Sequence, residues 1–391
     1  VLERTLGVPI FQEQVMQIAI VAAGFTPGEA DQLRRAMAAW KRKGGLGPFE
    51  AKLKDGLRRN GYSEEFAHRI FEQIKGFGEY GFPESHSASF ALLAYASAWL
   101  KHHEPAAFLC GLLNSQPMGF YAPAQIIQDA RRHGVEVRPV DVNQSGWDSC
   151  LEDAGKQQPA VRLGLHCVGG LQEDTGRRIE AARREASFQD VPDLAHRAAL
   201  DRKAFKRLAS AGALGPLAGH RHQAYWAALG VDEPWELGAA HATEAHPLLA
   251  RPTEGQDIVA DYASLGFTLG RHPLALLRPQ LERRRAVTAD RLRQLPNDTR
   301  VKVAGIVTHR QRPGSANGVI FVTLEDESGH VNAIVWPDLV ERQRHVLLHS
   351  RLLCIAGKLQ RDQESLHLIA SRLEDYTPLL GRIKQSSRDF R

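Results

Sequence analysis

Apolar residues in the first third of the chain recur at the three- and four-residue spacing of helices. Residues 12–21 form one such stretch. Thr26, as N-cap, and Pro27, at the first helical position, begin a second helix that continues to about Lys43. The same pattern predicts further elements, namely two helices within 48–76, helices at 86–102, from 105 onward and at 123–133, and a short strand at 134–140. The first third is therefore expected to be mainly helical.

Beyond residue 300 apolar positions alternate with polar ones, which is the period of a half-buried strand. Alternating stretches occur at residues 301–307, 319–324, 330–336, 351–357 and 365–370. A helix is expected at 338–347, between the third and fourth strands. This order predicts the small Greek-key barrel called the OB-fold. The residues before it, 221–297, are predicted to be a connecting region with helices at 256–265 and 273–284.

Glycines interrupt the short helices that are predicted for residues 143–220. Val168-Gly169-Gly170, followed by a basic helix, indicates a helix–hairpin–helix, whose turn directs backbone N–H groups toward DNA phosphates. The candidate charge contacts on that helix are Arg177, Arg178, Arg183 and Arg184. Residues 201–214 indicate a second, degenerate copy. The alternative interpretation is a plain helical linker.

The predicted barrel carries candidate DNA contacts of two kinds. Its basic candidates are Lys302, Arg310, Arg312 and Lys358, and its aromatic candidates are Phe321 and Trp336. Barrels of this type bind single strands with a positive groove and with aromatic rings on which bases stack. The alternative is that Phe321 and Trp336 belong to the core and that the loop charges are only solvated.

Composition extends the picture to classes of protein. The chain has 391 residues, 43% of them apolar, which suffices for two to four domains. No apolar run is long enough for a transmembrane helix. The net charge is +5, and the excess lies in residues 251–391, which hold 22 Lys and Arg against 16 Asp and Glu. This excess favours a polyanionic partner such as nucleic acid, although a slightly basic soluble protein would show it too.

Metal and cofactor chemistry have little support in the sequence. Polymerases that use two metal ions hold them with clustered carboxylates, and the chain contains no Asp-x-Asp pair. Glu325-Asp326-Glu327 leads into Ser328-Gly329 and is interpreted as a turn between strands. The Gly-x-Gly-x-x-Gly pattern at 76–81 follows a helix rather than a strand, so no dinucleotide site is expected. Ser85 is interpreted as the N-cap of the next helix. We expect neither a catalytic nor a metal-binding residue in this chain.

Longer motifs resemble a known family. GVPIFQEQVMQI at residues 7–18, ADQLRRAM at 30–37 and FGEYGFPESHSA at 77–88 closely resemble the fingers domain of bacterial DNA polymerase III alpha subunits, which are C-family polymerases. GFTLGRHPL at 266–274 resembles the segment ahead of the family's OB-fold. Within the family, the chain is most similar to the error-prone, damage-inducible alpha-like branch, at residues 113–121, 128–137, 310–314 and 334–338.

The chain starts at Val1 without an initiator Met, which indicates a fragment of a longer protein. The resemblance implies that this protein is a polymerase and that the fragment has a multidomain α+β fold. The expected parts are the helical C-terminal portion of a fingers domain at 1–142, a tandem helix-hairpin-helix DNA-binding region at 143–220, a helical connecting region at 221–297, a five-stranded OB-fold β-barrel at 298–378 and a C-terminal tail at 379–391.

By the same resemblance, nucleotide-binding residues would lie near the incoming deoxynucleoside triphosphate (dNTP), where arginine neutralises phosphate charge. These residues are Arg34, Arg35, Ser85 and His86. Two positions depart from the family pattern. Glu84 stands where replicative relatives tend to carry lysine, and Cys167 stands at the first glycine of the hairpin motif.

The resemblance also implies an activity and partners. The full-length enzyme would be a DNA-directed DNA polymerase of translesion synthesis and damage-induced mutagenesis, with Mg²⁺ held by palm aspartates upstream of Val1. This chain alone would bind primer–template DNA and single-stranded template, would hold no cofactor and would be inactive. A Y-family-like adaptor protein and, through it, the sliding clamp would be partners in the bacterial cytoplasm, with no membrane involved. Two alternatives stay open, a fragment of a replicative alpha subunit and a non-enzymatic single-strand DNA-binding scaffold.

Overall fold

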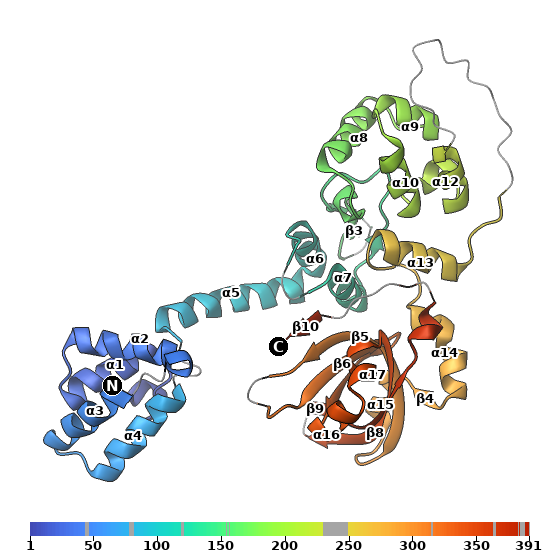
Figure 1. Ribbon diagram of the computed structural model, residues 1–391. Coiled ribbons are helices and arrows are strands. Elements are labelled where there is room, and N and C mark those ends of the chain that lie inside the picture. Colours follow the sequence, from blue (N-terminus) through green and yellow to red (C-terminus); the bar gives the residue numbers. More distant parts are fainter. Residues whose placement is uncertain are drawn as a thin grey trace. The chain divides into compact units, whose positions relative to one another are not determined.

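The structure is a computed structural model (Figure 1), and its contacts divide the chain into two compact units, Val1–His103 and Glu104–Arg391. Each unit is described on its own. The structure describes residues 1–43, 47–77, 82–118, 121–153, 155, 157–229, 249–313, 316–362, 365–381, 383 and 388–390, with the backbone alone at 38–43, 77 and 388–390. No helix in these ranges has both the length and the apolar character needed to cross a membrane.

The first unit is helical, as predicted. After a short 3₁₀ turn at Glu3–Thr5, its helices are α1 Gln12–Ala23, α2 Pro27–Lys43, α3 Gly47–Arg59, α4 Glu64–Phe77 and α5 Glu84–His103. Val15, Leu57 and Ile74 are fully buried in the core that α1 to α4 share. The Thr26 hydroxyl accepts from the N–H of Glu29, and the Glu29 carboxylate accepts from the N–H of Thr26. This reciprocal cap confirms the predicted start of α2.

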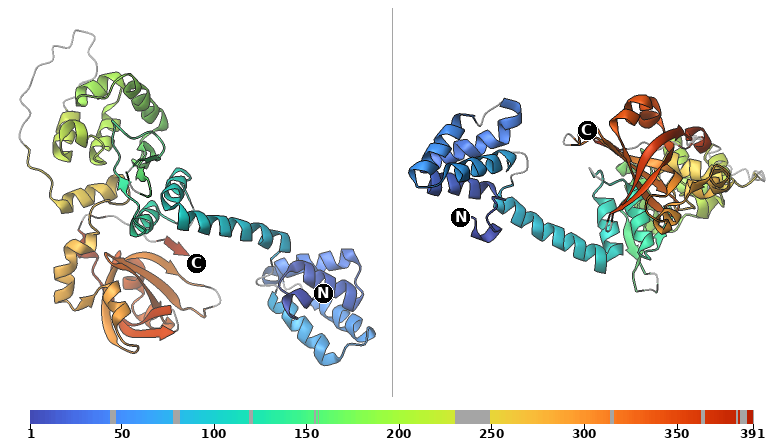
Figure 2. Two further views of the ribbon diagram at one scale, coloured as in Figure 1. Left: turned by 180° about the vertical axis from the view of Figure 1, so that it is seen from behind. Right: turned by 90° about the horizontal axis from the view of Figure 1, so that it is seen from below.

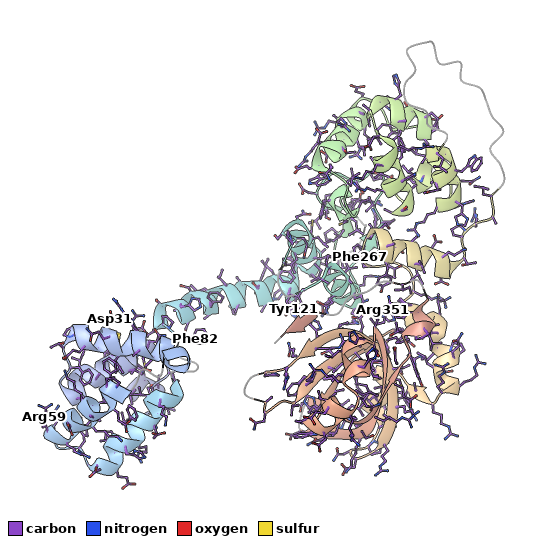
Figure 3. All side chains as sticks on the ribbon, in the orientation of Figure 1. Asp31, Arg59, Phe82, Tyr121, Phe267 and Arg351 are labelled. Carbon is purple, nitrogen blue, oxygen red and sulfur yellow. The ribbon has the colours of Figure 1, made fainter. Side chains whose placement is uncertain are left out.

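Helix α5 differs from α1 to α4 because it contains no buried residue. It begins at Glu84, so the prediction of Ser85 as its N-cap is wrong. The reason is that the Pro83 carbonyl closes the first turn and accepts from both the N–H and the hydroxyl of Ser87. Phe90 and Trp99 are exposed, and Figure 3 shows side chains along the whole helix. A helix that is apolar on every side is normally buried.

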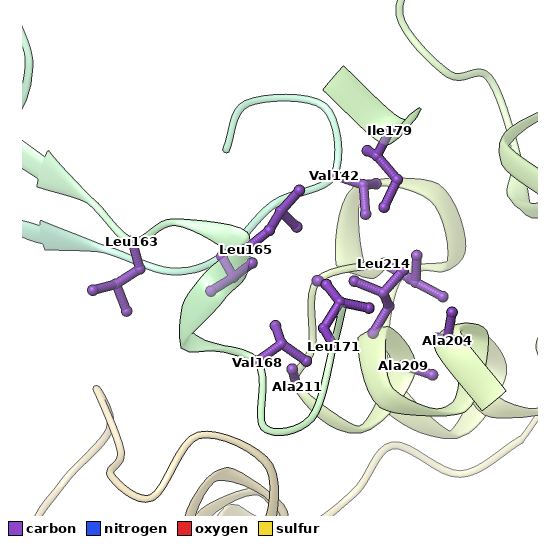
Figure 4. Close-up of a cluster of buried hydrophobic side chains, with 14 of the residues drawn as sticks. Val142, Leu163, Leu165, Val168, Leu171, Ile179, Ala204, Ala209, Ala211 and Leu214 are labelled. Atoms are coloured by element: carbon purple, nitrogen blue, oxygen red, sulfur yellow. The ribbon is translucent and has the colours of Figure 1, made fainter. Parts of the chain in front are cut away.

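The hairpin region, residues 134–229, begins the folded core of the second unit. A small sheet has the order β1-β3-β2, with strands β1 Val137–Arg138, β2 Cys150–Glu152 and β3 Ala160–Arg162. After a 3₁₀ turn at Leu165–Cys167 come α8 Glu173–Glu185, α9 Val191–Arg197, α10 Arg202–Ser210, α11 Gly215–Ala218 and α12 Arg221–Leu229. Figure 4 shows Val168 and Leu171, from the first hairpin, beside Ala211 and Leu214, from the second copy. The two copies therefore share one core.

Helices α6 Pro105–Asn114 and α7 Pro123–Arg132 also belong to the second unit. Leu109, Leu113 and Ile127 are buried in the same core as the hairpin region. The predicted fingers domain, residues 1–142, therefore spans both compact units. Its last two helices, α6 and α7, bury their apolar faces in the core of the hairpin region.

Helices α13 Glu254–Ser264 and α14 Pro273–Arg283 confirm the two helices predicted for the connecting region. Strand β4 Ala286–Val287 and helix α15 Ala289–Gln294 follow. Ile258 and Leu281 are buried together with Ile306 and Leu352 of the barrel. This part of the connecting region is thus built onto the barrel. Residues 230–248 lie outside the described residues.

The barrel matches the prediction in strand order and in its helical insertion. Its strands are β5 Arg300–Gln311, β6 Ile320–Asp326, β7 Gly329–Val335, β8 Leu352–Asp362 and β9 Ser365–Asp375. Their order is β5-β6-β7-β9-β8, and β8 pairs with β5 to close the sheet. Only the β7–β9 pair within this ring is parallel. Helices α16 Pro337–Arg342 and α17 Arg344–His349 lie between β7 and β8 along the chain (Figures 1 and 2). A 3₁₀ turn at Thr377–Leu380 and β10 Arg388–Phe390, which pairs with β5, follow.

Candidate nucleic-acid interface

The first hairpin is fixed by backbone contacts on both sides. Its Gly169 N–H donates to the carbonyl oxygen of Ser264, at the end of α13, over 2.7 Å. Gly170 has a φ of +74°, which favours glycine, and its carbonyl oxygen accepts from the Arg207 guanidinium of α10. The Gly169 amide is therefore engaged inside the protein. The predicted donation from this N–H to a DNA phosphate would require that bond to Ser264 to break.

Cys167, at the start of this hairpin, is a structural residue. Its thiol lies 3.6 Å from Nε2 of His166, and burial raises its pKa to about 11. Cys167 is consequently an uncharged thiol at neutral pH. The partly buried side chain packs against the core of the hairpin region, so Cys167 anchors the hairpin rather than acting as a reactive group.

The arginines predicted for DNA contact on α8 are mostly committed within the protein. Arg177 forms ion pairs of 3.2 Å with both Glu173 and Glu180. Arg178 forms one of 2.5 Å with Asp174. Both arginines stay exposed, but nearby carboxylates offset their charge. We therefore expect their attraction for phosphate to be weak.

Arg183 and Arg184 lie in the last turn of α8 and differ sharply. Arg183 is half-buried and donates to the carbonyl oxygens of Val142 and Ser145, at 2.8 and 2.7 Å, so it holds the preceding loop in place. Arg184 is exposed, and no ion pair or hydrogen bond of its side chain occurs among the described residues. Of the predicted arginines, Arg184 is the best placed for a phosphate.

The second copy keeps the hairpin geometry but is covered. Gly212 has a φ of +77°, and a Cβ there would lie 3.1 Å from Nη2 of Arg221. Arg221 in turn forms ion pairs with Asp257, at 2.8 Å, and with Asp261 of α13. Helix α13 thus occupies the approach to this hairpin with its own carboxylates.

Two basic residues that the sequence interpretation missed lie beside the first hairpin. Lys203 and Lys206 of α10 are exposed and line a groove that also includes Gly169. Their spacing was a usable signal, because residues three apart share a helix face. The opposite face, with Phe205 and Leu208, is buried.

The barrel presents an apolar outer row that crosses three strands. Phe321 of β6 pairs with Ile334 of β7, which pairs with Ile369 of β9. Each is only half-buried, whereas their neighbours Val322, Ala333 and Leu368 point into the core. Trp336, directly after β7, is 53% exposed. These exposures decide the earlier alternative, since neither Phe321 nor Trp336 is a core residue.

A polar row runs beside the outer row on the same face. Thr323 pairs with His309 on one side and with Asn332 on the other, and Asn332 pairs with His367. The side chains of this row offer hydrogen-bond donors and acceptors without a formal carboxylate. The face therefore places one aromatic ring, Phe321, beside neutral polar groups, and aromatic rings are the part of a single-strand site on which bases stack.

Arg310, a predicted DNA contact, is a buried structural residue. The pairing of β5 with β6 shifts between Val307 and His309, which marks a β-bulge. The extra residue reverses which side chains point inward beyond that point. Arg310 is consequently 6% exposed, and it donates to the carbonyl oxygens of Leu347 and Ser350 at 2.7 and 2.5 Å. We withdraw Arg310 from the DNA-binding surface.

The other basic candidates of the barrel lie at its surface. Lys302 pairs with Glu374 at 3.2 Å, and Lys358 pairs with Asp298 at 2.8 Å. Arg312 is exposed in the loop between β5 and β6. Most of the predicted positive groove is therefore offset by carboxylates.

A buried carboxylate joins the barrel to neighbouring helices. Glu325 is 3% exposed, and its oxygens lie 3.0 Å from Nε2 of Gln128, 3.3 Å from Nε2 of His272 and 3.2 Å from Nε2 of His330. The N–H of Leu274 donates to Nδ1 of His272, so the neutral ring carries its proton on Nε2, facing the carboxylate. Burial would raise the pKa of Glu325, but His272 and His330 outweigh it and hold the pKa well below its usual range.

The residues expected near the triphosphate lie on two helices of the first unit. Arg34 and Arg35 both form ion pairs with Asp31, at 2.8 and 2.7 Å (Figure 3 labels Asp31). Ser85 and His86 are exposed at the start of α5. No hydrogen bond or ion pair joins the two arginines to this pair among the described residues.

Glu84, the departure from the replicative pattern, is neutralised locally. Its carboxylate pairs with Arg4 at 2.6 Å. His86, nearby, stacks on Phe82 with ring centroids 5.9 Å apart and lies tilted against Phe90 at 4.4 Å. The start of α5 is thus an exposed polar and aromatic surface without an uncompensated negative charge at Glu84.

The described residues do not fit a magnesium site. No group of three or more His, Cys, Asp or Glu in the described ranges could hold a metal ion. Glu325 and its neighbours form a turn instead, in which Asp326 accepts from the N–H groups of Ser328 and Gly329.

Comparisons with known proteins agree with this arrangement. Family models match the bacterial DNA polymerase III alpha subunit finger domain at residues 1–61, the helix-hairpin-helix motif at 134–224 and the OB-fold nucleic acid binding domain at 301–376. The whole chain is 61% identical to error-prone DNA polymerases of Alkalilimnicola ehrlichii and Azoarcus sp., and 59% identical to that of Pseudomonas fluorescens. It spans 37–38% of the length of these relatives. Over its whole length the chain is similar to one part of these error-prone DNA polymerases.

This correspondence confirms the resemblance and the fold class. It also favours the error-prone branch over the replicative alternative, because the relatives named above are all error-prone polymerases. The proposed contact residues come from the geometry of the hairpin region and of the barrel.

Proposed function

We propose that this chain holds DNA and helps to bind the incoming nucleotide within an error-prone DNA polymerase. The observation that carries the proposal is the identity of 61% over the entire chain to such polymerases. The exposed stacking face of the barrel supports it, because apolar rings on an OB-fold surface otherwise carry a cost in water.

In this proposal each part of the chain has a separate task. Phe321 stacks on a base of single-stranded template, Ile334 and Ile369 extend this apolar surface, and the neighbouring polar row hydrogen-bonds to the bases. The hairpin region holds the duplex behind the primer terminus through phosphate contacts, of which Arg184 provides one. Arg34, Arg35, Ser85 and His86 face the triphosphate of the incoming dNTP.

The chemistry itself depends on the rest of the polymerase. Mg²⁺ and its carboxylate ligands would come from outside this chain and would stabilise charge on the transferred phosphoryl group. A role in translesion synthesis, a Y-family-like adaptor, an indirect contact with the sliding clamp and a cytoplasmic location complete the proposal.

The test is binding of the purified chain to labelled single-stranded, duplex and primer–template DNA between about 50 and 200 mM salt, the range over which phosphate contacts are revealed. We expect binding to all three, with the tightest binding to the primer–template junction. Primer extension with Mg²⁺ and dNTPs is expected to give no product. Binding to single strands alone would support the scaffold alternative, and extension by this chain would contradict the division of tasks.

A further inference from the structure

The groove between α10 and α13 has the features of an anion site that no predicted contact explains. It has a volume of about 330 Å³ and is bounded by the first hairpin, by α10 and by the last turns of α13. Gly169, Ala260 and Ala263 supply small walls. Lys203, Lys206 and Arg207 supply three positive charges.

Hydrogen bonds of Ser264 and Arg207 hold the walls of the groove together. The Ser264 carbonyl oxygen accepts from the Gly169 N–H over 2.7 Å, and the Ser264 hydroxyl lies 2.7 Å from the Ala260 carbonyl oxygen and 3.2 Å from that of Ser210. Ser264 thereby ties the hairpin to α13 and places α10 beside them. Arg207 adds a second tie, through its hydrogen bond to the Gly170 carbonyl oxygen. The site is thus formed before any ligand binds.

The two lysines are the part of the groove available to a ligand. Both are exposed, and no ion pair or hydrogen bond of either occurs in the part of the chain that the structure describes. The nearest carboxylates of α13, Asp257 and Asp261, are engaged by Arg221. Asp201, at the start of α10, accepts from the N–H of Ala204 as a helix cap. No described carboxylate lies within ion-pair distance of Lys203 or Lys206.

We propose that Lys203 and Lys206 bind backbone phosphates of duplex DNA in this groove, in place of the engaged Gly169 amide. The inference rests on the proposed function, and it moves the main phosphate contact from the arginines of α8 to α10 and α13. Ammonium groups contact phosphate as point charges and read no sequence. The site therefore gives affinity for any duplex.

The experiment compares the unchanged chain with the double variant Lys203→Gln/Lys206→Gln on duplex DNA across a salt series. Each lost phosphate contact lowers the slope of log affinity against log salt by about 0.9, so the double variant should lose about 1.8. Between 50 and 200 mM salt, that change corresponds to about a tenfold difference in how far affinity falls. The variant Lys203→Arg/Lys206→Arg keeps both charges and should keep the slope.

A matched control removes the same charge elsewhere. Lys52→Gln/Lys75→Gln changes two lysines that pair with Glu29 and Glu72, and it should leave the slope unchanged. Thermal unfolding followed by circular dichroism checks that every variant is folded. Inorganic pyrophosphate serves as a probe for free polyphosphate, the other source of the same chemistry.

The outcomes separate this inference from the proposed function. An unchanged slope in Lys203→Gln/Lys206→Gln, with normal duplex binding by the unchanged chain, overturns the groove and leaves the proposed function intact. Pyrophosphate binding that requires both lysines, together with an unchanged DNA slope, also overturns it. Absence of duplex binding by the unchanged chain overturns both proposals.

Discussion

The hairpin region and the barrel are both built for nucleic acid, yet they use their charges in opposite ways. At the first hairpin two lysines of α10 have no carboxylate partner among the described residues. In the barrel most of the corresponding candidates are paired, as Lys302 is with Glu374, or buried, as Arg310 is, and Arg312 alone among the four predicted ones is exposed without an ion pair in the described part of the chain. The exposed face of the barrel is instead apolar and neutral, at Phe321 and the residues beside it.

This difference shows that net charge and contact surface are separate properties. The basic excess lies in residues 251–391, but many of those cations form ion pairs or hydrogen bonds within the protein. Arg278 forms ion pairs with Asp326 and Glu327, and Arg351, labelled in Figure 3, donates to the Ile383 carbonyl oxygen. A basic segment can therefore mark a region that needs many guanidinium donors rather than one that binds a polyanion.

The largest effect is expected when the buried cation of the barrel is removed. Arg310→Ala leaves the carbonyl oxygens of Leu347 and Ser350 without their donor inside the protein. We expect the free energy of unfolding to fall by about 3 kcal/mol, since each unsatisfied buried acceptor costs about 1–3 kcal/mol. Chemical denaturation followed by circular dichroism measures the change.

Arg312→Ala is the matched control, because Arg312 lies two residues away and is exposed. It should change stability by less than about 0.5 kcal/mol, as surface substitutions usually do. Equal effects of the two substitutions would mean that Arg310 is not the internal donor described above.

The second prediction concerns Glu325, through which the barrel contacts α7 and α14. Glu325→Gln replaces a carboxylate that accepts from Gln128 and His330, and should lower the free energy of unfolding by about 2 kcal/mol at neutral pH. A carboxyl whose pKa is depressed by folding stabilises above its unfolded pKa of about 4.3, and this contribution is lost as the pH falls. The gap between unchanged chain and variant should therefore narrow below about pH 4. A gap of constant size from pH 7 to 3, measured by urea denaturation, would contradict the charged state of Glu325.

The third prediction tests the neutral surface of the barrel. Phe321→Ala removes the ring at one end of the outer row, and single-strand affinity should fall about tenfold, because stacking of one base is worth about 1–3 kcal/mol. The salt dependence should stay the same, since no phosphate contact is lost. Fluorescence anisotropy with labelled single strands measures both quantities.

Trp226→Ala is the control for this prediction, because Trp226 is an aromatic residue of the hairpin region that is 54% exposed. Its removal should leave single-strand affinity unchanged. A loss as large as that of Phe321→Ala would mean that exposed aromatic rings in general, rather than the barrel face, attract single strands.

Elements of the fold were predictable from the sequence because periodicity and caps are local. Thr26 and Pro27 mark the start of α2, and the alternating stretches after residue 300 mark the strands of the barrel. The burial of Arg310 was not predictable from the sequence. The bulge after Val307 reverses which side chains of β5 point into the barrel, and nothing in the residue types of the strand marks it. One extra residue in a strand thus turned a predicted DNA contact into a buried donor.

Contact residues of the hairpin region were predicted less well, because pairing between elements is not visible in one segment. Arg183 sits in the same basic run as Arg184, but it donates to Val142, 41 residues away. The Gly169 N–H donates to the carbonyl oxygen of Ser264, which lies far along the chain in helix α13. Lys203 and Lys206 stand out only once the carboxylates of α13 are seen to be engaged by Arg221.

The smallest effect is expected at Arg177, and it sharpens the difference between α8 and α10. Arg177→Gln removes a guanidinium whose charge Glu173 and Glu180 already offset. Stability should change by less than about 0.5 kcal/mol, because exposed ion pairs contribute little. The salt slope for duplex DNA should stay within error of the unchanged chain, whereas Arg184→Gln should lower it by about 0.9. Equal slopes for the two variants, measured in the same titration series, would show that pairing with carboxylates does not decide which arginines of α8 contact phosphate.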